Sequence, residues 1–246
     1  MTVLVEHFDL EVRADRQLPL FEARYNIAPT QDVLAVREAD GVREAAMMRW
    51  GLIPSWSKEP GGGPPMINAR SETLAEKPAF RTAFRRRRCI IPADGFYEWK
   101  KSAGGAKGTK QPYYIHRPDG KPFGFAGLWE AWSGSSPNSL PGGGSPSPAR
   151  LLATSPGGRG GIASCTIVTT AANRALAELH DRMPVILAPA DYTLWLDPKV
   201  EEPEKLQYLL APCGEEELVV EPVSTHVNRV VNDDPQCIAV ERSLFE

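Results

Sequence analysis

Short apolar runs separated by turn-forming residues recur along the whole chain, and they predict a strand-rich protein. The strand-like runs cover residues 32–36, 45–50, 96–100, 112–116, 122–129, 165–170, 185–188 and 218–222. Helical patterns are few and short, and they cover residues 170–180, 191–196 and 205–210. The sequence contains no regular βαβ alternation, no glycine-rich phosphate loop and no internal repeat. We therefore expect an α+β fold dominated by strands, with irregular connections.

Residues 133–161 break this pattern, because 20 of these 29 residues are Gly, Ser or Pro. Such a segment is too poor in apolar groups to pack. Strand-like runs resume on both sides, so we expect a mobile surface insertion within one sheet, in a single domain that spans residues 1–246. A shorter Gly-rich stretch at 104–108 predicts the tip of a hairpin that joins 96–100 to 112–116.

The composition fits a folded domain with a sizeable core: of 246 residues, 42% are hydrophobic and 24% are charged. No apolar run approaches the ~20 residues that span a bilayer. The first ten residues include Glu6, His7 and Asp9, which is unlike a secretory signal peptide. We therefore expect a cytosolic protein without a membrane partner.

The four cysteines, Cys89, Cys165, Cys213 and Cys237, are scattered along the chain. They form no CxxC pair, and no histidine follows at the spacing of a zinc site. The sequence therefore predicts reduced structural thiols, with no disulfide framework, no metal site and no other cofactor.

The charge is unevenly distributed, although the net charge is only -3. Residues 81–110 contain five Arg, Arg85 among them, and four Lys against two acidic residues, a local balance of +7. Residues 196–221 contain eight acidic residues against two Lys, a balance of -6. Because binding depends on the local field, the basic segment is a candidate phosphate-binding face. The alternative is an ordinary solvated face.

A carboxylate lies between aromatic residues in the sequence Pro-Ala-Asp-Gly-Phe-Tyr-Glu-Trp, which runs from Pro92 to Trp99. Burial beside aromatic rings disfavours the charged form of a carboxyl group and raises its pKa. Glu98 is therefore a candidate proton shuttle, next to arginines that favour a phosphate-bearing partner.

Two further polar stretches are surrounded by apolar residues. In Met-Ile-Asn-Ala-Arg-Ser-Glu-Thr, Asn68 can both donate and accept hydrogen bonds, and Arg70 offers a planar fork that suits phosphate. In Leu-His-Asp-Arg-Met-Pro-Val, His180 supplies an imidazole, the group that most often transfers protons near neutral pH. Alternatively, such residues only cap loops.

The sequence Trp-Gly-Leu-Ile-Pro-Ser-Trp begins at Trp50 and ends at Trp56. Exposed indole or proline faces can stack on unpaired bases, a contact worth about 1–3 kcal/mol for aromatic rings. The alternative places Trp50 in the core. The sequence Arg-Tyr-Asn-Ile-Ala-Pro-Thr supplies a further arginine, Arg24, and a rigid turn at Pro29.

Taken together, in this order and at these separations, the five stretches resemble the SOS response-associated peptidase family. The resemblance runs from about residue 7 to about residue 232, nearly the whole chain. The Asn-Ala-Arg-Ser-Glu, Asp-Gly-Phe-Tyr-Glu-Trp and His-Asp-Arg-Met-Pro motifs make it specific. Members of this family shield abasic sites in single-stranded DNA by forming a covalent crosslink. The resemblance implies a strand-rich, barrel-like single domain with a few short helices and a basic groove.

The resemblance also implies a mechanism. In the family, a cysteine exposed by removal of the initiator methionine attacks the ring-opened sugar aldehyde through its amine, and its thiol then closes a thiazolidine. Glu98 would open the sugar, Asn68 would orient the amino terminus, and His180 would be the second proton-transfer group. The residues expected to contact DNA are Arg70, Trp50, Trp56, Pro29, Arg24 and Arg85. The implied partner is single-stranded DNA with abasic sites, bound by a monomer that associates with the nucleoid.

The start of the chain departs from the family pattern. The family begins Met-Cys-Gly-Arg, whereas this chain begins Met1-Thr2-Val3 and lacks the nucleophile. Residues 3–10 look like the segment that follows the cysteine motif, so we expect a start codon assigned too late or a shortened chain. Two alternatives are a natural variant that binds DNA without crosslinking, and Thr2 acting as a poorer amino-terminal nucleophile.

The function expected is therefore abasic-site binding, with crosslinking and self-processing in a form that carries the amino-terminal cysteine. One alternative is a non-catalytic single-stranded DNA-binding module. Another is a peptidase that cleaves other proteins, for which the sequence offers neither the pattern of a Ser-His-Asp catalytic triad nor a metal-binding motif.

Overall fold

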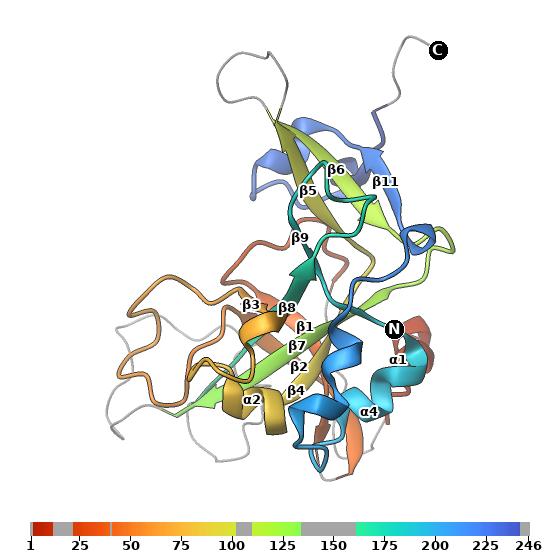
Figure 1. Ribbon diagram of the computed structural model, residues 1–246. Helices are drawn as coiled ribbons and strands as arrows, with labels where there is room; N and C mark the ends of the chain where they lie inside the picture. Colours follow the sequence, from red (N-terminus) through yellow and green to blue (C-terminus); the bar gives the residue numbers. More distant parts are fainter. Residues whose placement is uncertain (1, 12–21, 40, 102–109, 134–160, 242–246) are drawn as a thin grey trace.

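The computed structural model describes residues 2–11, 22–39, 41–101, 110–133 and 161–241 (Figure 1). The predicted hairpin tip at 104–108 lies outside the described residues, and so does nearly all of the predicted insertion.

The larger sheet closes on itself and forms a barrel. Its ring consists of β1 (Asp32–Ala39), β2 (Val42–Trp50), β4 (Arg88–Ala93), β7 (Phe123–Trp132) and β8 (Ile162–Ala171). The strands pair in the order β7-β4-β1-β2-β8, and β8 pairs again with β7, which completes the ring. Three short strands, β3 (Asn68–Arg70), β9 (Arg182–Pro184) and β10 (Ile186–Leu187), extend this sheet. The barrel-like expectation is confirmed.

The smaller sheet contains three antiparallel strands and rises from one end of the barrel (Figure 1). It consists of β5 (Gly95–Lys101), β6 (Lys110–His116) and β11 (Val219–Pro222). Only Asp94 separates β4 from β5, so one continuous stretch of chain passes from the barrel into the smaller sheet. Gly95 is required at this crossing, because a Cβ there would lie 2.4 Å from the ring of Tyr114 and 2.6 Å from a backbone oxygen.

The described residues contain three apolar clusters, of which the two larger ones lie on the two sides of the barrel wall. One contains residues from all five ring strands and therefore occupies the barrel interior; its members include Val33, Met48, Cys89, Phe125 and Cys165. The other lies between the outer barrel surface and the helices α1 (Thr2–Phe8), α2 (Arg81–Arg86) and α4 (Tyr192–Leu196). Alternate residues of a strand face opposite sides, so neighbours such as Cys89 and Ile90 serve different clusters.

Seven short 3-10 helices occupy connections in the described part of the chain. They are η1 (Ser71–Thr73), η2 (Pro189–Asp191), η3 (Pro203–Lys205), η4 (Gln207–Leu210), η5 (Glu215–Glu217), η6 (Thr225–Asn228) and η7 (Pro235–Ile238). No helix in the described ranges is long and apolar enough to span a bilayer.

Most predicted strands are present, but the predicted helix at 170–180 is wrong. Its first residues continue β8, and residues 174–179 form turns. Asn173 stabilises the first of these turns, because its Oδ1 accepts a hydrogen bond from the Leu176 backbone N–H at 3.2 Å. The strands on either side of residues 133–161 pair with each other, with Trp132 opposite Ile162.

Arg88 fastens two helices to the barrel. Its side chain is only 2% exposed and donates to four backbone oxygens, those of Phe84 and Arg85 at 2.6 Å and those of Trp195 and Asp197. Burial lowers the pKa of Arg88 to about 10, which leaves the group cationic at neutral pH. A planar fork of donors can satisfy carbonyls from both α2 and the end of α4.

Replacing Arg88 with Lys should destabilise the fold by about 2–4 kcal/mol, because a single ammonium cannot reach all four carbonyls and leaves buried acceptors unpaired. Urea unfolding followed by circular dichroism measures this loss. The control is Arg85→Lys, an exposed neighbour, for which about 0.5 kcal/mol or less is expected. Equal losses in the two variants would contradict the role assigned to Arg88.

Candidate functional site

Strand β8 brings the Asn68 and His180 stretches together. Arg70 of β3 pairs with Thr169 in a parallel register, and Pro184 of β9 pairs with the same Thr169 in an antiparallel register. The two stretches, more than 100 positions apart in sequence, therefore flank one short segment of β8. Asn68 and Arg70 are exposed on β3, while the alternate residue Ala69 is buried.

A salt bridge connects the same two stretches through their side chains. The Arg182 guanidinium binds the Glu72 carboxylate with both terminal nitrogens, at 2.6 and 2.9 Å, and also donates to the Thr169 carbonyl at 2.6 Å. Hydrogen bonding from Arg182 lowers the pKa of Glu72 to about 2, so the carboxylate is ionised throughout the neutral range. Arg182 thus spans β8 from β9 to η1.

Glu98 joins this group from the smaller sheet. It lies on β5 opposite Tyr113, on the same face of the strand as Phe96, which packs on Phe123 and Phe125. Burial raises the pKa of Glu98, and the nearby His180 opposes this shift most strongly. Glu98 and His180 are therefore close enough to interact, and a half-buried carboxyl group beside an imidazole suits proton transfer.

The ring of His180 has a backbone partner in either protonation state. When the imidazole is neutral, Nδ1 accepts a hydrogen bond from the Arg182 N–H at 3.0 Å. When the ring is protonated, Nδ1–H can donate to the Arg182 carbonyl at 3.2 Å and to Asp181, also at 3.2 Å. Since Nδ1 is engaged both ways, Nε2 is the nitrogen left to exchange a proton with a ligand.

A second ion pair holds the turns before His180 against the smaller sheet. Lys100, two residues beyond Glu98 on the same face of β5, binds Glu178 at 2.8 Å. Both side chains are exposed, so this pair contributes little to stability, but it holds together the two segments that carry Glu98 and His180.

The two tryptophans have different environments. Trp50 donates its indole N–H to the Ile67 carbonyl at 2.9 Å and packs against the interior cluster, so it is partly a core residue. This bond holds the indole against Ile67, the residue that directly precedes Asn68 in the sequence. Trp56 is 67% exposed and offers a free apolar ring face.

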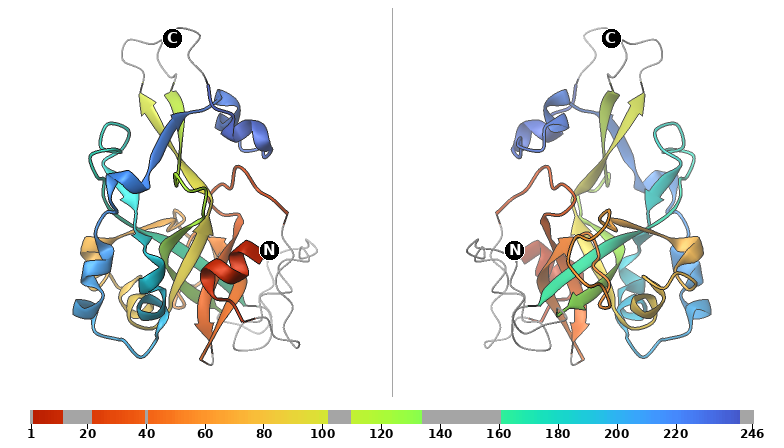
Figure 2. Two further views of the ribbon diagram at one scale, coloured as in Figure 1. Left: turned by 90° about the vertical axis from the view of Figure 1, so that its right-hand side faces the viewer. Right: turned by 90° about the vertical axis from the view of Figure 1, so that its left-hand side faces the viewer.

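Arg24 and Pro29 lie on a segment that is bound to the C-terminal part of the chain (Figure 2). Arg24 forms an ion pair with Asp233 and donates to Gln31 at 2.9 Å, whereas Pro29 is exposed. Buried Asn26 donates to backbone oxygens of this C-terminal segment, including that of Asn232 at 2.9 Å. Part of the positive charge of Arg24 is therefore neutralised within the protein.

Several arginines of the basic run at 81–88 form contacts within the protein. Arg86 binds Glu201 at 3.0 Å, Arg87 binds Glu130 at 2.5 Å, and Arg88 is buried. Arg81 and Arg85 are the exposed members of α2 with no ion pair to another described residue. Tertiary contacts therefore already engage Arg86, Arg87 and Arg88 within the protein, and a phosphate-binding face formed by the run stays a prediction.

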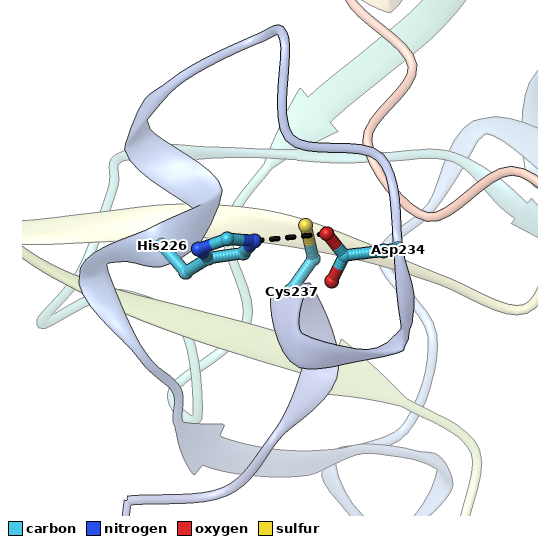
Figure 3. A group of neighbouring side chains, drawn as sticks. All are labelled: His226, Asp234 and Cys237. Atoms are coloured by element: carbon cyan, nitrogen blue, oxygen red, sulfur yellow. Dashed lines mark hydrogen bonds and ion pairs between the residues drawn. The ribbon is translucent and has the colours of Figure 1, made fainter.

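One cluster in the described residues resembles a metal site (Figure 3). The ligand atoms of His226, Asp234 and Cys237 lie within 4.8 Å of one another. However, the Asn232 amide donates to the His226 carbonyl at 2.7 Å and presents its other hydrogen to His226 Nδ1 at 3.2 Å. The hydrogen of the neutral ring then lies on Nε2, where it is donated to Asp234 at 3.0 Å. A metal would need this nitrogen, so the cluster fits a group of hydrogen bonds that stabilises the C-terminal segment better than it fits a cation site.

These features define a class of protein: a closed barrel with an attached three-stranded sheet, and a carboxyl–imidazole pair where the two meet. The model of the SOS response associated peptidase (SRAP) family matches residues 2–230, and the chain belongs to this family.

Relatives and solved structures agree with this assignment. The chain is 38% identical to the abasic site processing protein YoqW of Bacillus subtilis, over 96% of this chain and 93% of that protein. It is 31% identical to the abasic site processing protein YedK of Escherichia coli, over 97% and 92% of the two chains. A crystal structure of a protein from Bordetella bronchiseptica superposes with a TM-score of 0.67 at 26% identity, covering 91% of this chain and 95% of that one.

The raised pKa of Glu98 predicts a pH-dependent stability. Between the ordinary pKa of an unfolded glutamate and the raised pKa of the folded state, the native protein binds more protons, so stability falls as pH rises. Glu98→Gln removes this loss. The variant should melt at a higher temperature than the parent at pH 8, and the difference should shrink toward zero near about pH 4.

Differential scanning fluorimetry across this pH range measures the effect. The exposed Glu204→Gln is the matched control, with the same change of charge, and should melt like the parent at both pH values. A difference between Glu98→Gln and the parent that does not change with pH would contradict the raised pKa.

Proposed function

We propose that this protein binds single-stranded DNA at abasic sites, and that a form carrying an amino-terminal cysteine crosslinks to the site and processes its own amino terminus. The names of its relatives speak of abasic site processing, and the single-stranded DNA, the crosslink and the self-processing are added by this proposal. The single observation that carries it is the placement of half-buried Glu98 within the electrostatic reach of His180, whose stretch flanks β8 opposite the strand that carries Asn68 and Arg70.

The chemistry requires protons to move at defined steps. Opening the abasic sugar breaks the bond between C1′ and the ring oxygen; the ring oxygen gains a proton, and the C1′ hydroxyl loses one to leave an aldehyde. A protonated Glu98 is suited to give the first proton, and His180 to take the second. Attack by the amine releases water and forms an imine, and addition of the thiol to the imine carbon closes the thiazolidine as the nitrogen regains a proton.

The DNA strand is proposed to run past the exposed edge of β3. There Arg70 is placed to bind a phosphate, while Trp56 and Pro29 offer exposed apolar faces on which unpaired bases can stack. The contacts assigned to Trp50, Arg24 and Arg85, the basic groove, and a monomer associated with the nucleoid all stay predictions.

Crosslinking is tested with a form in which the Met-Cys-Gly-Arg start of the family is added ahead of the present chain. Incubated with a single-stranded abasic oligonucleotide, it should form an adduct that survives denaturing electrophoresis, and mass spectrometry should show loss of the initiator methionine. Glu98→Gln and His180→Asn should each slow adduct formation by about 10²-fold or more, the usual contribution of a positioned acid or base. Glu204→Gln is the control and should react like the parent.

The result that would refute the crosslinking proposal is a folded cysteine-bearing form that yields no adduct. If that form still binds the oligonucleotide, the protein is a non-catalytic DNA-binding module.

Binding alone can be tested with the chain as it stands, on single-stranded DNA that carries a non-reactive abasic analogue. Affinity should fall as salt rises, and Arg70→Ala should reduce the slope of log K against log salt by about 0.7, the value for one phosphate contact on a single strand. Fluorescence anisotropy gives this slope. Lys77→Ala, an exposed cation on the chain beyond η1, is the control. An unchanged slope in Arg70→Ala would exclude a phosphate contact there.

A further inference from the structure

A salt bridge between two exposed or partly exposed residues usually contributes little, yet the Glu72–Arg182 pair differs from other surface pairs of this protein. Its geometry is bidentate, at 2.6 and 2.9 Å, and the arginine side chain is largely covered. The Arg182 Nε is enclosed without a partner among the described residues, so the two terminal nitrogens make all of the polar contacts of the guanidinium. Without Glu72, a mostly buried cation would lose its only carboxylate partner in the described chain.

The same arginine also holds the proposed proton-transfer group. Its backbone N–H and carbonyl are the partners of His180 Nδ1, at 3.0 and 3.2 Å. Its side chain reaches across β8, through the Thr169 carbonyl, to Glu72 in the turn that directly follows Asn68 and Arg70. A movement of Arg182 would therefore change the orientation of the imidazole and its distance from β3 together.

We infer that Glu72 is a positioning residue: through Arg182, it fixes His180 relative to Asn68 and Arg70. This inference rests on the proposed function, but it concerns a residue that would touch neither the sugar nor the nucleophile. The pair remains formed over the neutral pH range because the Glu72 carboxylate stays ionised there. A misplacement of about 1 Å in a catalytic group can cost as much as 10²-fold in rate. Loss of the Glu72–Arg182 salt bridge should therefore lower the crosslinking rate measurably.

The test uses the cysteine-bearing form and separates rate from affinity. Glu72→Gln keeps the size of the side chain but removes the charge; the single-turnover crosslinking rate at saturating oligonucleotide should fall about tenfold or more, while affinity for a non-reactive abasic analogue changes less than about twofold. Glu76→Gln is the matched control, an exposed glutamate four residues along the same segment, and should react like the parent. Arg182→Lys cannot form the bidentate pair and should also react slowly.

Coupling provides a second criterion. The double variant Glu72→Gln/Arg182→Lys should react no more slowly than the slower single variant, because both changes remove the same salt bridge. Multiplied losses in the double variant would show independent roles and overturn the inference. A rate for Glu72→Gln equal to that of Glu76→Gln would overturn it too. Tighter DNA binding by Glu72→Gln at an unchanged rate would mean that the carboxylate competes with a phosphate for Arg182.

A readout without crosslinking distinguishes failure of this inference from failure of the proposed function. In the chain as it stands, the NMR signals of the His180 ring should shift or broaden in Glu72→Gln but not in Glu76→Gln, at constant melting temperature. If the cysteine-bearing parent forms no adduct, the proposed function fails, and the NMR comparison still decides whether Glu72 positions His180. Unchanged His180 signals in Glu72→Gln would overturn the inference.

Discussion

The architecture depends on one strand, β8, which pairs with four others. Its first half pairs with β7 on one side and β2 on the other, and this pairing closes the barrel. Its second half pairs with β3 and β9, where the ring strands diverge. Closure satisfies the backbone donors and acceptors that open edges would leave exposed. The short strands added at the end of β8 bring the polar residues of the site to the barrel rim.

The passage of the chain from β4 into β5 creates the special environment of Glu98. Because Asp94 is the only residue between the two strands, β5 begins against the barrel, and Phe96 packs on Phe123 and Phe125. Glu98, on the same face, is half-buried and loses part of its hydration. This desolvation costs stability when the group is ionised, and it is the same physical effect that keeps a carboxyl group protonated and able to act as an acid.

Ion pairs and hydrogen bonds inside the protein engage many of the arginines that the sequence alone suggests for ligand binding. Arg86, Arg87 and Arg88 are engaged by Glu201, Glu130 and backbone carbonyls, so the basic run mainly attaches α2 and the end of α4 to the barrel. Arg182, in contrast, belongs to the site stretch but faces Glu72. Charge density in a sequence shows that cations are present, whereas their partners determine whether they are available to a phosphate.

The sequence by itself determined most strands, the three polar motifs and the candidate residues Asn68, Glu98 and His180, because apolar patterning and turn residues are local signals. Only the tertiary structure decided that residues 170–180 form a strand end and turns, since pairing of β8 with β9 holds that backbone extended up to Ala171. It also decided that Glu72 meets Arg182, across 110 residues, and that Arg24 meets Asp233, across 209. Such contacts arise from barrel closure, which depends on strand pairings between distant segments and leaves no trace in any single stretch of sequence.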